Sequence, residues 1–259
     1  MSLSEVDFLH YNSHILIPEI GDVGQEKFNN ATVMIIGLGG LGCPVAAYLA
    51  ASGIGRIGLC DFDSVEKTNL QRQLLFSEND INKPKVQVIK KQIGKINKRI
   101  LVDAHNKKFQ DLMVDADYDI FIDCTDNMDT KLFINDFCYR AKKKLITGSA
   151  TRLEGQIIGF DFEKNSKCCL ECIFDKSGAS QFNCSDLGIL VSLLGMMGCL
   201  QVTMTLNMIL GNFKKHGIVS RFDSFESQWI ELKPSDKVNC PICDLLKPVS
   251  YTHLTLPTT

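Results

Sequence analysis

The stretch VMIIGLGGLGCPVAAYLAASGIG, residues 33–55, decides the fold. It begins with an apolar run typical of a buried strand and continues with Gly37, Gly39 and Gly42 in G-x-G-x-x-G spacing. Small residues follow and favour a helix over residues 41–52. A turn of this kind brings backbone N–H groups and a helix N-terminus close to a phosphate. The pattern predicts a nucleotide site, and by itself it fits NAD and ATP equally.

The remainder of the chain predicts the sheet. We expect strands at residues 57–61, 100–104, 119–123 and 145–147, and helices at residues 85–98 and 128–141. Strands that alternate with helices at this spacing are typical of a parallel sheet. Alternating segments at residues 154–162, 220–225 and 228–233 predict antiparallel strands, the first of them at an exposed edge. The predicted class is α/β: a Rossmann-like, mostly parallel sheet with helices on both faces, extended by antiparallel strands.

Composition narrows the class of protein. The chain has 259 residues, of which 45% are hydrophobic and 22% charged, and its formal net charge is -2. These values are typical of a soluble globular protein and give no basic field for a nucleic acid. The first ten residues contain Glu5, Asp7 and no apolar run, so no signal peptide is expected. Eleven scattered cysteines without such a signal favour reduced thiols and a cytoplasmic location.

Residues 188–210 contain no charged side chain and have about the length of a membrane span. Polar side chains interrupt the segment, namely Ser192, Gln201, Thr203, Thr205 and Asn207. No basic cluster flanks it closely. The two alternatives are a membrane helix and a helix buried in a core or interface, and the polar residues favour the second.

Charged residues at successive strand ends favour ATP over NAD. Asp61 follows the glycine loop at the distance expected for a carboxylate that binds a ribose hydroxyl. Arg72 and Lys85 come after the second strand, and a triphosphate needs more cations than a dinucleotide does. Asp126 follows the fourth strand, where a carboxylate near phosphates implies an intervening Mg²⁺. An NAD-dependent oxidoreductase remains the alternative enzyme.

Several motifs occur in an order that resembles the ThiF/MoeB/HesA family. They are the glycine loop, DFDSVEKTNLQRQ, KPK, DCTDN and EGQI, and the resemblance runs from about residue 11 to residue 243. It implies a homodimeric adenylyltransferase that activates the C-terminal Gly-Gly carboxylate of a small ubiquitin-like sulfur carrier protein. ATP would be consumed and Mg²⁺ would be bound. A separate protein would donate sulfur, and the pathway would be thiamine or molybdenum cofactor biosynthesis. Neither nucleic acid nor membrane is an expected partner.

The resemblance also implies roles for individual residues. Gly37, Gly39, Gly40 and Gly42 would form the phosphate loop, with Gly40 approaching the phosphates, and Asp61 would bind the ribose. Thr68, Asn69, Leu70, Gln71, Arg72 and Lys85 would line the triphosphate, and Asp126 with Asn127 would serve the metal and the nucleotide. Arg72, Lys85 and Asp126 are the expected catalytic residues, together with Cys184, which is treated below.

Two C-x-x-C pairs, Cys169 with Cys172 and Cys240 with Cys243, suggest a metal site. Four thiolates in tetrahedral array suit structural Zn²⁺, and a redox pair or spare thiols are the alternative. The same pairs occur at matching places in the family. We expect one domain over residues 1–250, with a nucleotide-binding half at about 30–150 and a carrier-docking and zinc half at 151–246. Residues 251–259 carry no usable pattern and form a tail.

Two positions raise further questions. Cys184 lies in QFNCSDLGIL near an expected helix N-terminus, where thiolates are stabilised. In some family members a cysteine in a similar context forms a covalent link to the carrier, so Cys184 is either such a residue or an inert thiol. The segment HYNSHI places His10 and Ser13 where the family has arginines, the second of which reaches the neighbouring subunit's triphosphate. A non-catalytic relative that binds nucleotide or carrier is therefore a second hypothesis.

Overall fold

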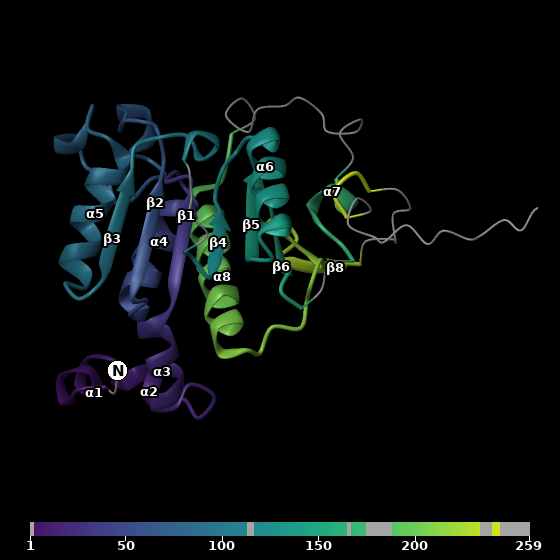
Figure 1. Ribbon diagram of the computed structural model, residues 1–259. Helices are drawn as coiled ribbons and strands as arrows, with labels where there is room; N and C mark the ends of the chain where they lie inside the picture. Colours follow the sequence, from purple (N-terminus) through teal and green to yellow (C-terminus); the bar gives the residue numbers. More distant parts are fainter. Residues whose placement is uncertain (1–2, 113–116, 165–166, 175–187, 234–239, 244–259) are drawn as a thin grey trace, which may run out of the picture.

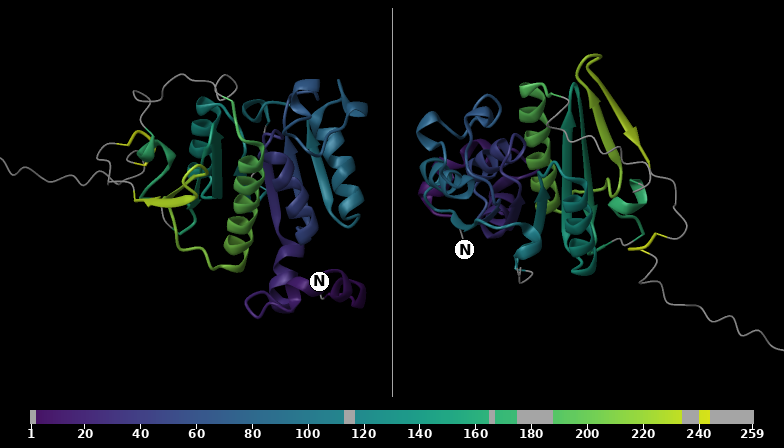
Figure 2. Two further views of the ribbon diagram at one scale, coloured as in Figure 1. Left: turned by 180° about the vertical axis from the view of Figure 1, so that it is seen from behind. Right: turned by 90° about the horizontal axis from the view of Figure 1, so that it is seen from above.

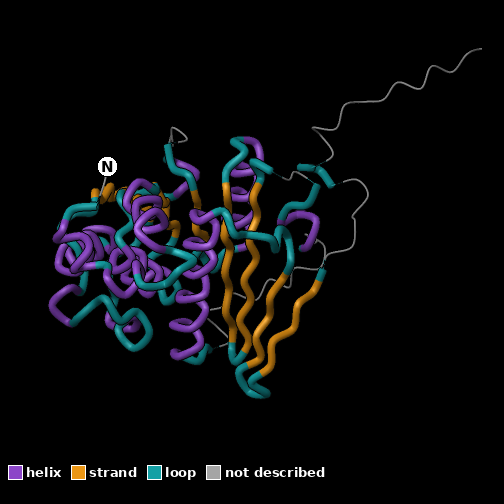
Figure 3. Tube along the Cα trace, turned by 90° about the horizontal axis from the view of Figure 1, so that it is seen from below, coloured by secondary structure: helices purple, strands orange, loops and turns teal. Residues whose placement is uncertain are grey.

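The computed structural model describes residues 3–112, 117–164, 167–174, 188–233 and 240–243. Their strands form one eight-stranded sheet in the order β3-β2-β1-β4-β5-β6-β7-β8 (Figure 1). The parallel strands are β1 (Thr32–Ile36), β2 (Arg56–Cys60), β3 (Leu101–His105), β4 (Ile120–Asp123) and β5 (Lys144–Thr151). The antiparallel strands are β6 (Glu154–Asp161), β7 (Val219–Asp223) and β8 (Gln228–Leu232), which continue the sheet beyond β5 (Figure 3). The predicted fold class is confirmed.

Helices cover both faces of this sheet. The chain starts with α1 (Glu5–His10), α2 (Asn12–Ile15) and α3 (Gly21–Asn30), which lie beyond the amino ends of the parallel strands (Figure 1). One face packs against α4 (Gly42–Ser52), α5 (Lys85–Ile96) and α8 (Val191–Leu210). The other packs against α6 (Met128–Arg140) and α7 (Leu170–Ile173). Three single-turn helices are η1 (Lys67–Asn69), η2 (Glu78–Asp80) and η3 (Phe109–Asp111).

The structure differs from the sequence prediction in the antiparallel part. β5 continues to Thr151 because all of its last residues pair with β6. The prediction of β6 as an exposed edge strand is wrong: β7 pairs along its free side, and β6 is buried over most of its length. The exposed edge of the antiparallel part is β8, whose five residues are all exposed.

The apolar segment that ends at Leu210 forms α8. By length and composition it is the one described helix that could cross a membrane. In the fold it lies lengthwise against β5, β6 and α4 (Figure 2), and Leu193, Met197 and Thr205 are buried on its inner side. Its place is that of a core helix.

The strand order places a crevice between β1 and β4. The crossover from β1 runs to one side of the sheet and the crossover from β4 to the other, so the connections leave a gap outside the carboxyl ends of these two strands. Ligands of open α/β sheets bind at this point. The glycine loop follows β1 and the DCTDN turn follows β4, so the two predicted motifs meet there.

Candidate nucleotide site and metal centre

Two glycines of the loop are required by close backbone packing. Gly37 has φ +88°, and a Cβ there would lie 2.9 Å from the backbone carbon and oxygen of Cys124. A Cβ at Gly42 would lie 2.1 Å from the Gly37 carbonyl oxygen. A Cβ at Gly37 would push the loop away from the end of β4, and the positive φ there disfavours any other residue, whereas a Cβ at Gly42 would collide with the loop's own backbone.

Gly39 and Gly40 face different surroundings. A Cβ at Gly40 would lie 2.5 Å from Leu194 Cδ1, so this glycine allows α8 to pack under the loop. A Cβ at Gly39 would have only Gln73 Nε2 near it, at 3.7 Å. Gly39 therefore leaves open space beside the Gln73 side chain, which suits a phosphate that approaches the loop backbone.

Asp61 supports the same loop from β2. Its Oδ2 accepts a hydrogen bond from Leu38 N–H at 2.6 Å, and its Oδ1 accepts one from Asp63 N–H at 2.8 Å. Burial raises the pKa of this carboxyl, and the charge of Lys85 together with these backbone donors opposes the rise. Asp61 thus fixes the loop geometry, and its oxygens still have free lone pairs for a ribose hydroxyl.

Lys85 is already engaged within the protein. Its Nζ lies 2.9 Å from Asp63 Oδ2, and the Lys85 side chain is 6% exposed. The sequence placed this lysine against the triphosphate, whereas the structure places it beneath the loop in an ion pair. A phosphate would have to compete with Asp63 for its charge.

The NLQRQ segment, residues 69–73, lies beside the glycine loop, since Gln73 is near Gly39. Asn69 is buried and its Oδ1 accepts the Glu66 N–H at 3.2 Å, so it fixes the start of the segment. Arg72 is partly exposed and donates from Nη1 to the Thr68 carbonyl at 2.9 Å, which leaves other guanidinium donors available. Gln73 is buried, and its Oε1 has no hydrogen-bond partner among the described residues.

The remaining members of the segment vary in exposure. Thr68 and Gln71 are exposed, and Leu70 packs partly against the core. Thr68 and Gln71 are therefore accessible to a ligand.

The turn after β4 presents Asp126 and Asn127. Both are exposed, and Asn127 Oδ1 caps α6 by accepting the Thr130 N–H at 3.0 Å. Asp126 makes no ion pair or hydrogen bond with a described residue. Its carboxylate is therefore available to a cation in the crevice.

Asp123, which the sequence analysis did not single out, is the buried hub of this turn. Its Oδ2 receives Lys131 Nζ at 2.9 Å and Thr147 Oγ1 at 2.5 Å. Its Oδ1 accepts from the backbone N–H and the hydroxyl of Thr125, at 3.0 and 2.6 Å. Lys131 also donates to the Gly148 carbonyl at 2.8 Å. These contacts join β4, β5 and α6 and fix the turn that carries Asp126.

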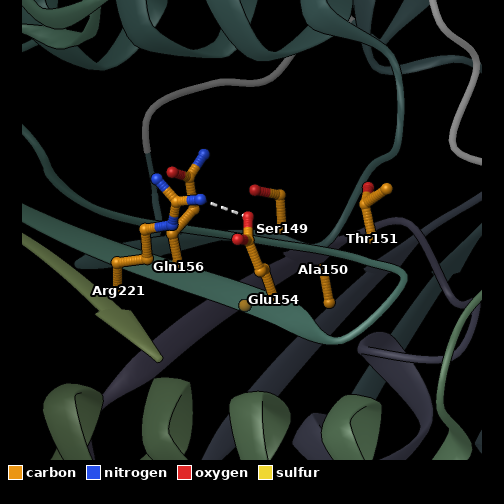
Figure 4. A pocket seen from close by; sticks show the side chains of 7 residues that line it. Ser149, Ala150, Thr151, Glu154, Gln156 and Arg221 are labelled. Atoms are coloured by element: carbon orange, nitrogen blue, oxygen red, sulfur yellow. Dashed lines mark hydrogen bonds and ion pairs between the residues drawn. The ribbon is translucent and has the colours of Figure 1, made fainter. Parts of the chain in front are cut away.

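A polar pocket of about 270 Å³ lies on β5, β6 and β7 (Figure 4). Ser149 lies two residues beyond Thr147 on β5 and pairs with Gln156 across to β6. Arg221 on β7 forms an ion pair with Glu154 across the pocket (Figure 4). Hydroxyl, amide and carboxylate groups therefore line a shallow path on the same face as the Asp123 network.

The four cysteines of the two C-x-x-C pairs come together, as predicted. Their sulfur atoms all lie within 4.8 Å of one another, with separations of 3.9 Å for Cys169–Cys172, 3.8 Å for Cys169–Cys240 and 3.6 Å for Cys172–Cys243. A tetrahedron with metal–sulfur bonds of about 2.3 Å has edges of about 3.8 Å, so the set fits a zinc-sized ion.

The thiols also show why a cation belongs there. A hydrogen bond from Cys243 lowers the pKa of Cys169 to about 6, and the Asn135 side chain contributes. Burial raises the pKa of Cys172 to about 12, and the thiolate of Cys169, by accepting the Cys243 proton, raises the pKa of Cys243 strongly. Four clustered sulfurs, three of them buried, would carry four negative charges stably around a metal ion.

The sequence analysis singled out two further positions, Cys184 and Ser13. Cys184 lies outside the described residues. Ser13 is exposed on α2, beyond the amino ends of the strands, whereas the glycine loop follows the carboxyl end of β1 (Figure 1). Ser13 therefore cannot reach the nucleotide site of its own chain.

Comparison with known proteins gives consistent results. The ThiF family model matches residues 11–242. The molybdopterin-synthase adenylyltransferase of Escherichia coli K12 is 34% identical over 93% of this chain and 98% of its own length. The sulfur carrier protein ThiS adenylyltransferase of the same organism is 35% identical over 93% and 97%. Adenylyltransferase and sulfurtransferase MOCS3 of Aedes aegypti is 38% identical, and the chain spans only 56% of that longer protein.

Solved structures agree with the fold. Escherichia coli MccB, in a crystal structure with MccA-N7isoASN, has a TM-score of 0.76 and 26% identity, over 92% of this chain and 74% of MccB. The relatives that match are named adenylyltransferases, as the sequence resemblance predicted. With nine-tenths of its length matched by one family model, the chain belongs to the ThiF family.

Proposed function

We propose that the protein uses ATP to adenylate the C-terminal carboxylate of a small ubiquitin-like sulfur carrier protein. The observation that carries the proposal is the arrangement at the carboxyl ends of β1 and β4. The glycine loop, which Asp61 holds through Leu38 N–H, follows β1, and the turn with the exposed Asp126 follows the neighbouring β4. Gln73, the residue after Arg72, lies beside Gly39. The names of the relatives point to sulfur carriers of the ThiS or molybdopterin-synthase type, and these define the substrate class.

The chemistry needs charge stabilisation more than proton transfer. The carrier carboxylate is ionised at neutral pH, because an α-carboxyl pKa is about 3.3–3.7. Its oxygen forms a bond to the α-phosphorus, the bond from that phosphorus to the bridging oxygen breaks, and pyrophosphate leaves. Negative charge accumulates on the phosphate oxygens, where Arg72 and the loop N–H groups can offset it.

Mg²⁺ fits the same site. Asp126 offers an exposed carboxylate without a protein partner, whereas Asp123 is committed to Lys131 and Thr147. A hard cation prefers such oxygen ligands together with phosphate oxygens. Bound there, Mg²⁺ would neutralise charge on the phosphates, and Asp126 would hold it near the crevice.

Zn²⁺ fits the cysteine cluster. The four sulfurs fill a tetrahedral shell with no position left open, which is the arrangement of a structural ion. Its role would be to fix residues 240–243 against α7 and α6. The four-cysteine site would thus be a supporting element and not part of the reacting site.

The polar pocket in Figure 4 would receive the end of the carrier. An extended Gly-Gly terminus has no side chains and exposes only peptide groups. Ser149, Gln156 and the rim of Glu154 and Arg221 offer donors and acceptors for such groups. The path leads along β5 toward the Asp126 turn, where the carboxylate would meet the nucleotide.

A homodimer would cover apolar side chains that the N-terminal segment exposes. The N-terminal helices expose Val6, Leu9 and Leu16 at 60%, 82% and 72%. Apolar side chains grouped on two adjacent helices are typical of a surface covered by a partner. The position of Ser13 beyond the strands' amino ends also suits a residue that faces a second subunit.

Nucleotide binding tests the first step directly. Isothermal titration of the purified protein with ATP and Mg²⁺ should show binding that Arg72→Ala weakens, and bound nucleotide released on denaturation should have the mass of an adenosine nucleotide. Tight NADH binding without ATP binding would contradict the proposal and favour the oxidoreductase.

One observation favours a second candidate, a non-catalytic nucleotide-binding or carrier-docking relative. Ser13 is uncharged and too short to serve as the arginine that the family supplies across the dimer, and loss of such an arginine can cost about 10³–10⁵ in rate. We expect slow adenylation that accelerates in Ser13→Arg. If neither protein transfers adenylate to any carrier, the non-catalytic candidate is favoured.

A further inference from the structure

Asn135 is a buried residue of α6 that the proposed reaction does not use. Its side chain is fully buried, and its Oδ1 accepts the Leu170 N–H at 2.9 Å. Leu170 directly follows Cys169, so the bond fixes the backbone at the first cysteine pair. The other end of the amide, Nδ2, is buried and forms no hydrogen bond of ordinary distance and angle with a described residue, although it lies close to the Cys169 sulfur. A buried donor without a partner costs about 1–3 kcal/mol, so its retention calls for an acceptor.

In the four-cysteine cluster, an ionised Cys169 sulfur is an acceptor that lies next to this amide. Cys169 is next to the residue that Asn135 already holds, and its sulfur lies 3.9 Å from Cys172 Sγ and 3.8 Å from Cys240 Sγ. A metal ion converts all of these thiols to thiolates, which accept N–H donors much better than thiols do. The Nδ2 group of Asn135 would therefore find a good acceptor once a metal ion is bound to the cysteines.

We propose that Asn135 is a positioning residue of the metal centre, with Oδ1 fixing the Cys169–Leu170 backbone and Nδ2 donating a hydrogen bond to the metal-bound Cys169 sulfur. This inference rests on the proposed zinc site. It adds a residue from α6 to a centre whose four ligands come from elsewhere in the chain. Donors of this kind hold a ligand in the orientation that the ion requires.

The buried side of α6 supports this role. Lys131, Asn135 and Tyr139 lie one helical turn apart and are all buried. Lys131 donates to Asp123, Asn135 holds the first cysteine pair, and Tyr139 Oη donates to the Cys243 carbonyl at 3.4 Å. Polar side chains at this spacing on a buried face need partners, and each of these contacts a different part of the two sites.

The substitution Asn135→Asp removes the Nδ2 donor and keeps an oxygen that can accept the Leu170 N–H. Aspartate has nearly the same volume and still accepts the Leu170 N–H, but it lacks the amide donor and brings a negative charge toward the thiolates. From the zinc-loaded full-length protein, zinc should transfer to excess EDTA about 10–100-fold faster than from the wild type. In the cobalt-substituted protein, the sulfur-to-cobalt charge-transfer band should move to lower energy, because a thiolate without its donor is oxidised more easily.

Asn97→Asp is the matched control. Asn97 is also buried, and its Nδ2 donates to Tyr11 Oη at 2.8 Å and to the Ala50 carbonyl at 3.2 Å, on the opposite face of the sheet from the cysteines. This variant should be less stable yet release zinc at the wild-type rate. Wild-type release and an unchanged cobalt band in Asn135→Asp would overturn the proposal, as would equally fast release in Asn97→Asp. If Cys172→Ser keeps as much zinc as the wild type, the zinc assignment fails first, and the role of Asn135 fails with it.

Discussion

The two ends of α6 hold their sites together by different means. At the first end, the Asp123 carboxylate receives Lys131, Thr147 and Thr125, so the buried charge of this turn is neutralised by protein groups. At the other end, four cysteine sulfurs lie within 4.8 Å of one another. The comparison teaches that protein groups neutralise the buried charge beside the nucleotide site, whereas the four sulfurs have the arrangement that fits a bound cation.

The largest expected effect comes from disrupting the four-cysteine cluster while the nucleotide site stays intact. Cys240→Ser, or removal of zinc by a chelator, should strongly lower the free energy of unfolding, because structural zinc is worth about 10–16 kcal/mol in small peptides. Differential scanning calorimetry with metal analysis measures the loss. Hydrogen exchange should show that β1 to β4 keep most of their protection. Equal loss of protection in both regions would contradict the distinction, and an unchanged melting temperature would refute the zinc site.

The second-largest expected effect comes from removing Asp123 from its contacts with Lys131 and Thr147. Asp123→Ala leaves Lys131 buried without its partner, and removing one member of a buried ion pair costs about 3–5 kcal/mol. Urea unfolding measures the change. The double variant Asp123→Ala with Lys131→Met should recover part of the loss, since no unpaired charge remains. Asp126→Ala is the exposed counterpart and should change stability by less than about 0.5 kcal/mol. If the two aspartates cost the same, Asp123 is not the hub described above.

A third effect separates chemistry from folding at the crevice. Arg72→Ala should cost about 3 kcal/mol in the adenylation step, as for the loss of one preorganised donor, and leave stability nearly unchanged. Steady-state kinetics together with thermal unfolding distinguish the two quantities. Lys67→Ala, which removes an exposed cation from the same loop, is the control. An equal loss in both variants would point to a general field and not to a specific contact.

The smallest expected effect concerns Cys184. It follows a polar segment and was not predicted beside the phosphates, so Cys184→Ser should leave pyrophosphate exchange unchanged. The same variant should lose any covalent carrier adduct seen by mass spectrometry of non-reduced samples. Abolished exchange in a folded Cys184→Ser protein would show that this cysteine takes part in the adenylation step.

Local patterns predicted much of this structure. The glycine loop, the parallel strands and α6 follow from apolar periodicity and glycine spacing, which act over a few residues. The cysteine pairs could be matched because each C-x-x-C unit is local. The end of β5 was missed because its last four residues, GSAT, are small and polar, and their strand form comes from pairing with β6.

Long-range pairing explains what the sequence could not show. Asp123 and Asp126 stand three residues apart in one motif, and only the fold reveals that the first is buried against Lys131 while the second is exposed. Lys85 looked like a free cation because nothing local indicates its ion pair with Asp63. Asn135 gave no signal at all, since its partners lie 35 residues further along the chain.

The most direct measurement of the central claim is exchange of labelled pyrophosphate into ATP, with and without purified ThiS-type or molybdopterin-synthase-type sulfur carriers. The account predicts exchange that requires Mg²⁺ and a carrier with an intact Gly-Gly terminus, and that falls strongly in Arg72→Ala. Absence of exchange with every such carrier, in a protein that is folded and binds ATP, would contradict it.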